Sequence, residues 1–265
     1  MKAYWFREGV FNFGDLIGPY LIARLTGRTP DWATAGEPDD PLYVTAGSVL
    51  GSTEIEMENA VVWGAGFMAA GDRMQAKPRR IAAVRGPLSA EMVRAQGIEC
   101  PKVYGDPGLL LPLLYRPEVE RVPHRIGIVT HYADEGAPWI ERAAKEENVI
   151  VISAARPKHG GVDGLIRSMK SCSCILSSSL HGLVVADAYG IPARWIEITD
   201  RVAGDGFKFK DYFASVGRPD DAPIRATGGV TPASVAPTAR PAHRPPLEVI
   251  EKLLAACPFV GRIER

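Results

Sequence analysis

The sequence has no excess of charge of either sign and no long apolar run. Its 31 lysines and arginines balance its 31 aspartates and glutamates, so its formal net charge is zero. A nucleic-acid-binding protein normally carries a basic excess, so the composition does not support that class, although a local basic patch stays open. No apolar stretch reaches the roughly 20 residues of a membrane-spanning helix, and the N-terminal segment MKAYWFREG lacks the apolar core of a signal peptide. We therefore expect a soluble cytoplasmic protein.

Signatures of metal sites and of nucleotide-binding loops are also missing. The four cysteines include one C-x-C pair, but no further ligands stand near it at the spacing of a zinc site. The patterns G-x-G-x-x-G and G-x-x-x-x-G-K-[ST] are both absent. We expect no metal and predict that the cysteines are reduced packing residues, namely Cys100, Cys172, Cys174 and Cys257.

The sequence does contain a repeated rhythm of a short apolar run, a glycine-containing turn and a helical stretch. Continuous apolar strands that alternate with helices are typical of buried parallel strands, so we predict an α/β fold with doubly wound sheets. The expected strands are 3–6, 42–47, 60–66, 80–86, 125–132, 149–155, 174–178 and 193–198. The expected helices are 12–27, 87–97, 138–148, 162–172, 180–190, 207–217 and 245–257.

The rhythm stops and restarts around the proline-containing and charged segment 116–124, which divides the chain into two Rossmann-like halves. In such folds ligands bind beyond the carboxyl ends of the strands. We predict an N-terminal domain over 1–118 and a C-terminal domain over 119–220. The segment 221–245, rich in proline and alanine, is expected to be a surface linker before a C-terminal helical segment over 246–265.

Three serines and a histidine stand at the strand-to-helix turn of the stretch ILSSSLHGLVVADAYGIPARWIE, residues 175–197. The first turn of a helix leaves backbone N–H groups unpaired, which makes it a site for anions. Ser178 and Ser179 add hydroxyl donors there, and His181 adds a donor that is charged or neutral near physiological pH. The alternative is that one serine caps the helix and His181 is an ordinary surface residue.

Other polar groups also follow predicted strands. Asn12 and Asp15 stand between a strand and a helix, where Asp15 could equally be an N-cap. Gly47 and Ser48 belong to a small-residue turn that a ligand could approach closely. Arg85 ends a strand and is suited to hold a carboxylate or phosphate, unless it forms a surface ion pair.

Three further candidates have equally ordinary alternatives. Asp106 could simply form a turn with the proline and glycine that follow it. His131 follows a strand and should point towards the same crevice, or else it is a loop histidine. Lys208 and Lys210 follow a glycine turn, and at least one of them is expected to be solvated.

Together these motifs resemble the polysaccharide pyruvyl transferase family, and most closely its bacterial exopolysaccharide ketal-pyruvate transferases. The resemblance extends over roughly residues 10–217. It rests on Asn-x-Gly-Asp at 12–15, Gly-Ser at 47–48, VRGP at 84–87, YGDPGLLLP at 104–112 and SSSLHGLVVADAYGIP at 177–192. The family implies a GT-B-like fold, in which two Rossmann-like domains face each other across a cleft and a C-terminal helix often returns to the first domain.

The resemblance also implies the chemistry. Such enzymes transfer pyruvate from phosphoenolpyruvate to two hydroxyls of a sugar, form a cyclic ketal and release phosphate. Phosphoenolpyruvate is then the donor substrate and no separate cofactor is expected. By resemblance, His181 is the general acid/base, and the donor-binding groups are Arg85, Ser178, Ser179 and Lys208. The cleft or acceptor groups are Asn12, Asp15, Gly47, Ser48, Asp106 and His131.

The chain departs from the family at one position. Many relatives have an arginine directly before the Leu-His pair, where this chain has Ser179. Either another cation replaces it, from Arg85, Lys208 or Arg201, or the donor lies differently.

The sequence leaves two rival functions and does not identify the acceptor sugar. A GT-B glycosyltransferase would use a nucleotide-sugar donor, and Glu197 could bind its ribose. A scaffold protein with a decayed site is the non-enzymatic alternative. By family chemistry, the acceptor is a lipid-linked oligosaccharide or polysaccharide, so we expect peripheral contact with the inner membrane face. The basic residues available for that contact are Arg218, Arg225, Arg240, His243 and Arg244.

Overall fold

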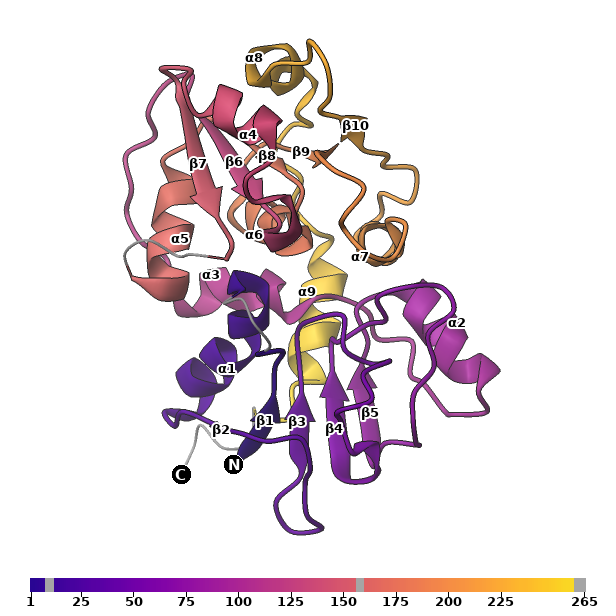
Figure 1. Cartoon of the computed structure of the whole chain (residues 1–265). Helices are drawn as coiled ribbons and strands as arrows, with labels where there is room; N and C mark the ends of the chain where they lie inside the picture. Colours follow the sequence, from indigo (N-terminus) through magenta and orange to yellow (C-terminus); the bar gives the residue numbers. More distant parts are fainter. Residues whose placement is uncertain (8–11, 156–159, 260–265) are drawn as a thin grey trace.

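The structure is a computed structural model that describes residues 1–7, 12–155 and 160–259. Within these residues the strands form two five-stranded sheets, one in each half of the chain, and every strand pair is parallel (Figure 1). The predicted α/β class with parallel sheets is confirmed. The first sheet contains β1 (Lys2–Tyr4), β2 (Asp31–Trp32), β3 (Leu42–Val44), β4 (Ala60–Trp63) and β5 (Arg80–Ala83). The second contains β6 (Ile126–Thr130), β7 (Val149–Ser153), β8 (Cys174–Ser177), β9 (Ala193–Glu197) and β10 (Ile224–Arg225).

Both sheets have the same strand order. The first runs β2-β1-β3-β4-β5 and the second runs β7-β6-β8-β9-β10 when it is followed from its opposite edge. In each sheet the second strand along the chain therefore lies on one side of the first strand. The third, fourth and fifth strands lie on its other side. A crevice opens where the strand order reverses, beyond the carboxyl ends of the strands. It lies between β1 and β3 in the first sheet, and between β6 and β8 in the second.

The strands of the first sheet end earlier than the sequence predicts. Three predicted strands reach residues 47, 66 and 86, whereas β3, β4 and β5 end at Val44, Trp63 and Ala83. Gly47 and Gly64 adopt φ angles of 115° and 89°, which extended strands do not use. The residues beyond the strand ends therefore form the turns that face the crevice.

Six of the seven predicted helices agree closely with the structure, whereas the short helices at Leu111–Leu114 and Pro232–Val235 were not predicted. The helix expected over 138–148 ends at Ala143, because residues 144–148 offer no large apolar side chain to bury. No helix in the described part of the chain is long and apolar enough to cross a lipid bilayer. The helices are α1 (Phe13–Thr26), α2 (Pro87–Ala95), α3 (Leu111–Leu114), α4 (Pro138–Ala143), α5 (Gly161–Lys170), α6 (Leu180–Tyr189), α7 (Phe207–Ser215), α8 (Pro232–Val235) and α9 (Leu247–Ala255). Short 3-10 turns η1 to η4 span Met57–Asn59, Pro107–Leu110, Tyr132–Asp134 and Ala236–Thr238.

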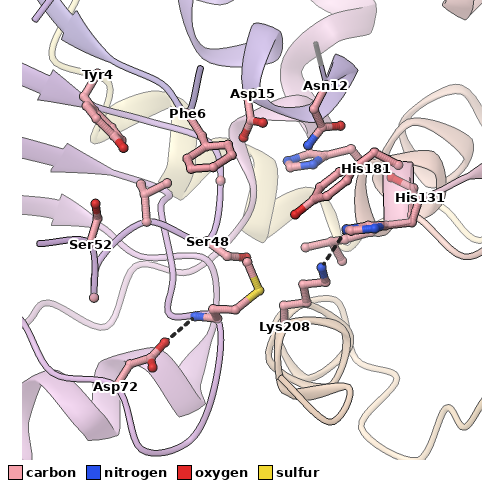
Figure 2. Close-up of a pocket in the computed structure, with 17 residues that line it drawn as sticks. Tyr4, Phe6, Asn12, Asp15, Ser48, Ser52, Asp72, His131, His181 and Lys208 are labelled. Carbon is pink, nitrogen blue, oxygen red and sulfur yellow. Dashed lines mark hydrogen bonds between the residues drawn. The ribbon is translucent and has the colours of Figure 1, made fainter. Parts of the chain in front are cut away.

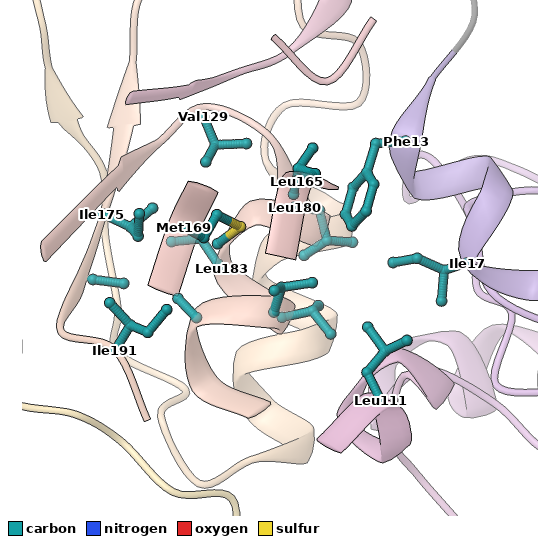
Figure 3. Close-up of a cluster of buried hydrophobic side chains, with 14 of the residues drawn as sticks. Phe13, Ile17, Leu111, Val129, Leu165, Met169, Ile175, Leu180, Leu183 and Ile191 are labelled. Carbon is teal, nitrogen blue, oxygen red and sulfur yellow. The ribbon is translucent and has the colours of Figure 1, made fainter. Parts of the chain in front are cut away.

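One apolar cluster joins the two halves. Phe13 and Ile17 of α1, from the N-terminal half, belong to the same cluster as Leu180 and Leu183 of α6, from the C-terminal half (Figure 3). Leu165 of α5 completes this contact. Burial of an apolar side chain of this size stabilises a fold by about 1.5–3 kcal/mol, so the cluster holds the two halves in a fixed relation. All four cysteines are buried, in agreement with their predicted packing role.

The segment 221–245 differs from the expected surface linker. Its β10 pairs in parallel with β9 and extends the second sheet. Ala226 and Val235 are almost fully buried in the apolar cluster beside that sheet. Proline and alanine are compatible with edge positions and close packing, so the composition alone did not distinguish this segment from a linker.

The basic residues after position 217 do not form one exposed surface. Arg218 is buried against Asp187, and Arg240 lies 2.5 Å from Asp221. The exposed Arg225 lies 3.5 Å from Glu197. Each of these arginines thus has a carboxylate partner within the chain, and Arg218 is removed from the set that could contact a membrane.

The last helix packs against the first sheet. The indole N–H of Trp63 in β4 donates a hydrogen bond of 2.9 Å to the carbonyl of Leu253 in α9. Leu253 and Phe259 share an apolar cluster with Trp63 and Tyr43. The domain boundaries inferred from the sequence remain a prediction, and residues 260–265 of the expected C-terminal segment lie outside the described residues.

We predict that Leu253→Ala destabilises the protein by about 2–5 kcal/mol, because it leaves a cavity where α9 meets the first sheet. Urea unfolding measures this loss. Leu247→Ala is the matched control on the same helix: its side chain is 70% exposed, so a change within about 0.5 kcal/mol is expected. Equal effects of the two substitutions would show that α9 does not depend on the Leu253 contact.

Candidate functional site

A cavity of about 350 Å³ lies where the crevices of the two sheets meet. Its walls come from the segments that follow β1, β3 and β4, and from those that follow β6 and β8, with α7 closing one side (Figure 2). Eight residues singled out from the sequence line it together. They are Asn12, Asp15, Gly47, Ser48, His131, Ser179, His181 and Lys208.

The three serines before α6 have different roles. Ser177 shapes the turn, because its hydroxyl oxygen accepts a hydrogen bond from the backbone N–H of Ser179 at 3.1 Å. Ser178 is not among the residues that line this cavity, and its hydroxyl oxygen accepts from the backbone N–H of His131 at 3.0 Å. Its role in donor binding stays a prediction. Ser179 is the N-cap residue, yet its side chain makes no capping hydrogen bond. Its hydroxyl and the first turn of α6 therefore face the cavity as anion donors.

His181 lies between the cavity and a buried carboxylate. Its Nε2 is 3.3 Å from Oδ2 of Asp106, and the other oxygen of Asp106 accepts a hydrogen bond from the N–H of Gly108 at 2.8 Å. Asp106 is completely buried and does not line the cavity, so it is not the cleft residue that the sequence suggested. A carboxylate at this distance from one imidazole nitrogen limits the orientations open to the ring. Asp106 thus orients His181 from behind.

The Asn-x-Gly-Asp segment packs directly on that histidine. Asn12, and not Asp15, is the N-cap of α1, because its side-chain oxygen accepts the N–H of Gly14 at 3.3 Å. A Cβ atom on Gly14 would lie 2.1 Å from Nδ1 of His181, which no real contact allows. Only glycine at position 14 lets α1 and the histidine ring approach this closely.

Asp15 brings a buried carboxylate into the cavity wall. Its side chain is 8% exposed, and its Oδ2 has no hydrogen-bond partner. Burial raises the pKa of Asp15 to about 6, and His181, Asn12 and Lys208 act in the opposite direction. The carboxyl group is thus largely ionised at neutral pH and remains close to its titration range.

Lys208 is the cation that faces the cavity. No other lysine or arginine occurs among the described residues that line it, and Arg201, a second candidate, is exposed elsewhere. Burial lowers the pKa of Lys208 to about 8, helped by the charge of Arg85. Its Nζ lies 3.2 Å from Nε2 of His131 (Figure 2), and burial and the nearby positive groups lower the pKa of His131 to about 3. His131 is therefore neutral at physiological pH.

Arg85 lies behind the cavity wall, and its predicted role in donor binding stays a prediction. It is completely buried and does not line the cavity. Its Nε donates to Asp211 at 3.0 Å and its Nη1 to the hydroxyl of Ser48 at 2.7 Å. Asp211 stands on α7 three residues after Lys208, so this buried ion pair positions Ser48 and Lys208 on two walls of the cavity.

The sequence missed the far end of the cavity. Tyr4, Phe6, Ser52 and Asp72 line it away from His181 (Figure 2). Tyr4 and Phe6 stand at and just beyond the end of β1, and the rule that ligands bind beyond strand ends could have indicated them. Asp72 accepts hydrogen bonds from the N–H groups of Met68 and Ala69, in a loop without any motif, so no sequence signal marked it.

A second cavity of about 260 Å³ lies beside β9 and contains Glu197, the residue expected to bind a ribose in a glycosyltransferase. Glu197 is paired there with Arg225 at 3.5 Å. This cavity and the first one have no lining residue in common. A ribose at Glu197 would thus lie in a different cavity from the His181 and Lys208 side chains.

Comparison with known proteins places the chain in one family. A sequence model of the polysaccharide pyruvyl transferase family matches residues 54–200, more than half of the chain. Uncharacterized protein L143 of Acanthamoeba polyphaga mimivirus is 28% identical over 211 residues, which cover 78% of this chain and 71% of that protein. Succinoglycan biosynthesis protein ExoV of Rhizobium meliloti (strain 1021) is 24% identical over 233 residues, which cover 84% of this chain and 68% of that protein. No solved structure matches the chain.

We predict that Asp15→Asn raises the free energy of unfolding by about 1–3 kcal/mol at neutral pH. Each unit by which burial raises the pKa of Asp15 corresponds to about 1.4 kcal/mol, which the amide does not lose. The pKa of Asp15 in the folded protein, about 6, lies above the ordinary value of 3.8. The raised pKa therefore has no effect on stability below pH 3.8, and it lowers the free energy of unfolding as the pH rises from 3.8 through 6. Urea unfolding across this range should show the gain of the variant appear with rising pH. Asp39→Asn, on an exposed side chain, should show no such pH-dependent gain, and a gain equal in both variants would contradict the argument.

We also predict that Gly14→Ala destabilises the fold by about 1–3 kcal/mol, because the new methyl group overlaps the ring of His181. Alanine normally stabilises a helix over glycine by up to about 1 kcal/mol, so the sign of the change isolates the clash. Gly71→Ala is the control, since nothing lies within 4 Å of its Cβ position. A Gly14→Ala protein as stable as wild type would mean that His181 moves freely.

Proposed function

The chain belongs to the polysaccharide pyruvyl transferase family, and from this premise we propose that it transfers pyruvate from phosphoenolpyruvate to two hydroxyls of one sugar in an exopolysaccharide precursor. The product is a cyclic ketal, and phosphate leaves. The observation that carries the proposal is the convergence of His181, Ser179 and Lys208 on one cavity, beside the N-terminus of α6.

The side of the cavity nearest α6 suits the donor. Phosphoenolpyruvate carries a carboxylate and a phosphate, which need N–H and cationic donors. The free first turn of α6, the hydroxyl of Ser179 and the amine of Lys208 supply them. We propose that Lys208 takes the place of the arginine that many relatives have at position 179, since Arg85 is buried and Arg201 lies elsewhere.

His181 is suited to the proton transfers of the reaction. Protonation of the methylene carbon makes the adjacent carbon of the donor electrophilic, and the same imidazole can then accept a proton from an attacking hydroxyl. Asp106 behind the ring holds its orientation through both steps. Asp15, ionised at neutral pH and directed into the cavity (Figure 2), is a second group that can accept a hydroxyl proton.

The other side of the cavity suits the sugar. Tyr4, Phe6, Ser52 and Asp72 offer aromatic and polar surface, and they come from the N-terminal half. We therefore propose a GT-B-like arrangement, with the donor held mainly by the C-terminal half and the acceptor by the N-terminal half. A lipid-linked oligosaccharide or polysaccharide is the proposed acceptor, met at the inner membrane face.

Thermal shift with phosphoenolpyruvate tests the donor assignment. We predict a rise in the melting temperature of wild type, because a ligand at 100 times its Kd stabilises the native state by about 2.7 kcal/mol. The rise should be smaller in His181→Ala and in Lys208→Ala. It should be unchanged in Lys210→Ala, an exposed lysine on the same helix.

Two results would contradict the proposal. If a nucleotide diphosphate shifts the protein and phosphoenolpyruvate does not, the fold serves a glycosyltransferase and the Glu197 cavity becomes the donor site. If phosphoenolpyruvate shifts wild type and the His181 and Lys208 variants equally, the donor binds outside the cavity described above.

A further inference from the structure

Two hydrogen-bond donors approach the imidazole of His131 from opposite sides. The backbone N–H of Ala133 donates to Nδ1 at 3.2 Å, and Nζ of Lys208 lies 3.2 Å from Nε2. A neutral imidazole has one nitrogen that accepts and one that donates. Only Nδ1 can be the acceptor here, because a backbone N–H cannot accept. The proton of His131 is therefore on Nε2, directed at Lys208.

This tautomer sets a condition on the lysine. An ammonium group has three donors and no acceptor, so it would face the Nε2–H of His131 donor to donor. A doubly protonated His131 would leave both contacts unsatisfied, because each of its nitrogens would then carry a proton that faces another donor. A neutral amine has a lone pair and accepts the Nε2–H. Both contacts of His131 are thus satisfied only when Lys208 is uncharged.

We propose that Lys208 is a neutral amine in part of the free protein, and in most of it in weakly alkaline solution, and that it takes up a proton when the anionic donor enters the cavity. Lys208 then becomes fully charged at the moment when the donor binds. This inference rests on the proposed function for the identity of the donor, but the charge of Lys208 in the free protein does not depend on it.

The groups around Lys208 agree with this state. Its side chain is 4% exposed, and none of the described carboxylates forms an ion pair with it. Burial and the charge of Arg85 disfavour the ammonium, and they outweigh the opposite effect of Asp15 and Asp134. Of these two carboxylates, Asp134 accepts a hydrogen bond of 2.5 Å from Thr199.

The remaining charged groups nearby are already engaged. His181, across the cavity, faces Asp106 at 3.3 Å. Asp211, on the same helix as Lys208, accepts from Arg85 at 3.0 Å and from the hydroxyl of Ser89 at 2.6 Å. Among the described residues, no carboxylate thus lies within ion-pair distance of Lys208, and Asp15 and Asp134 act on it only from farther away.

A bound phosphate or carboxylate supplies that charge. An anion within hydrogen-bond reach favours the ammonium strongly in a buried site, so the amine binds a proton from solvent and turns from His131 to the ligand. The one bond formed is the N–H bond of the added proton, which comes from solvent, and the number of protons taken up per donor equals the neutral fraction of Lys208 before binding. Donor affinity should then fall about tenfold for each pH unit above about 8, because the proton becomes scarcer while Lys208 stays neutral.

NMR of the free protein gives the first test. Carbon-13 labels on the lysine side chains follow the ionisation of each amine, and Lys208→Arg identifies the signal of Lys208. We expect a titration midpoint near 8. A midpoint at the ordinary lysine value, about 10.4, overturns the inference.

Calorimetry gives the second test, with phosphoenolpyruvate as the probe. Titration near pH 8 in buffers of different ionisation enthalpy counts the protons taken up, and the phosphate is already fully ionised there because the second pKa of a phosphate ester is about 6. We expect about half a proton per ligand at that pH, equal to the neutral fraction of Lys208. Binding without any dependence on the buffer overturns the inference.

Three variants identify the group that takes up the proton. Lys208→Arg should lose the uptake, because a guanidinium stays protonated. His131→Gln should reduce it, because the amide oxygen accepts from a charged Lys208 in the free protein. Lys210→Arg, on the exposed face of α7, should leave it unchanged. Equal uptake in all variants overturns the assignment to Lys208.

The two tests separate this inference from the proposed function. If phosphoenolpyruvate gives neither heat nor a thermal shift, the proposed function fails, and the NMR midpoint still decides the charge of Lys208. If phosphoenolpyruvate binds but Lys208 titrates as an ordinary lysine, the proposed function stands and this inference fails.

Discussion

The packing of α1 against α6 is the constraint on which the whole cavity depends. These two helices come from opposite halves of the chain, and their apolar side chains share one core. That core places Gly14 against the ring of His181, and the same approach brings Asp106 to its other side. The catalytic candidate is therefore held by groups from the N-terminal half although it belongs to the C-terminal half. Anything that separates the halves removes the orientation of this histidine.

A second contact between the halves is polar and completely buried. Asp211 of α7 accepts from Arg85 and also from the N–H and hydroxyl of Ser89, near the N-terminus of α2. Breaking such a pair by removing one partner costs about 3–5 kcal/mol, because the other charge is left buried. A pair of this kind is geometrically specific, and here it fixes the register of α7. Lys208 consequently projects into the cavity from a helix whose position is held by the buried contacts of Asp211.

The motifs that resemble the family describe this interface more than they describe ligand contacts. The glycine of Asn-x-Gly-Asp makes room for His181, and Gly86 of VRGP has no space for a side chain because Asp211 lies 2.0 Å from its Cβ position. Asp106 of YGDPG supports the histidine from behind. A motif residue in such a chain can thus support the cavity from a buried position, as Arg85 and Asp106 do. The matched span, residues 54–200, includes both of them but neither Asp15 nor Lys208. The sequence indicated these two residues because they stand close to turns that follow predicted strands. Only the folded structure shows that they line the same cavity.

The sequence by itself determined the α/β class and the position along the chain of most strands and helices, and it indicated the turn at 177–181 as a candidate anion site, because apolar periodicity and strand-end polar groups are local signals. It also indicated eight of the residues that line the cavity. Only the tertiary structure decided which of these act together. Strand order is not written in any local segment, and it was the order of the two sheets that brought the ends of β1, β3, β6 and β8 to one crevice. Burial also depends on the whole fold and not on a local segment. In the structure Arg85 is an internal support and Asp106 lies behind His181. Burial also shifts the pKa values of Asp15 and Lys208.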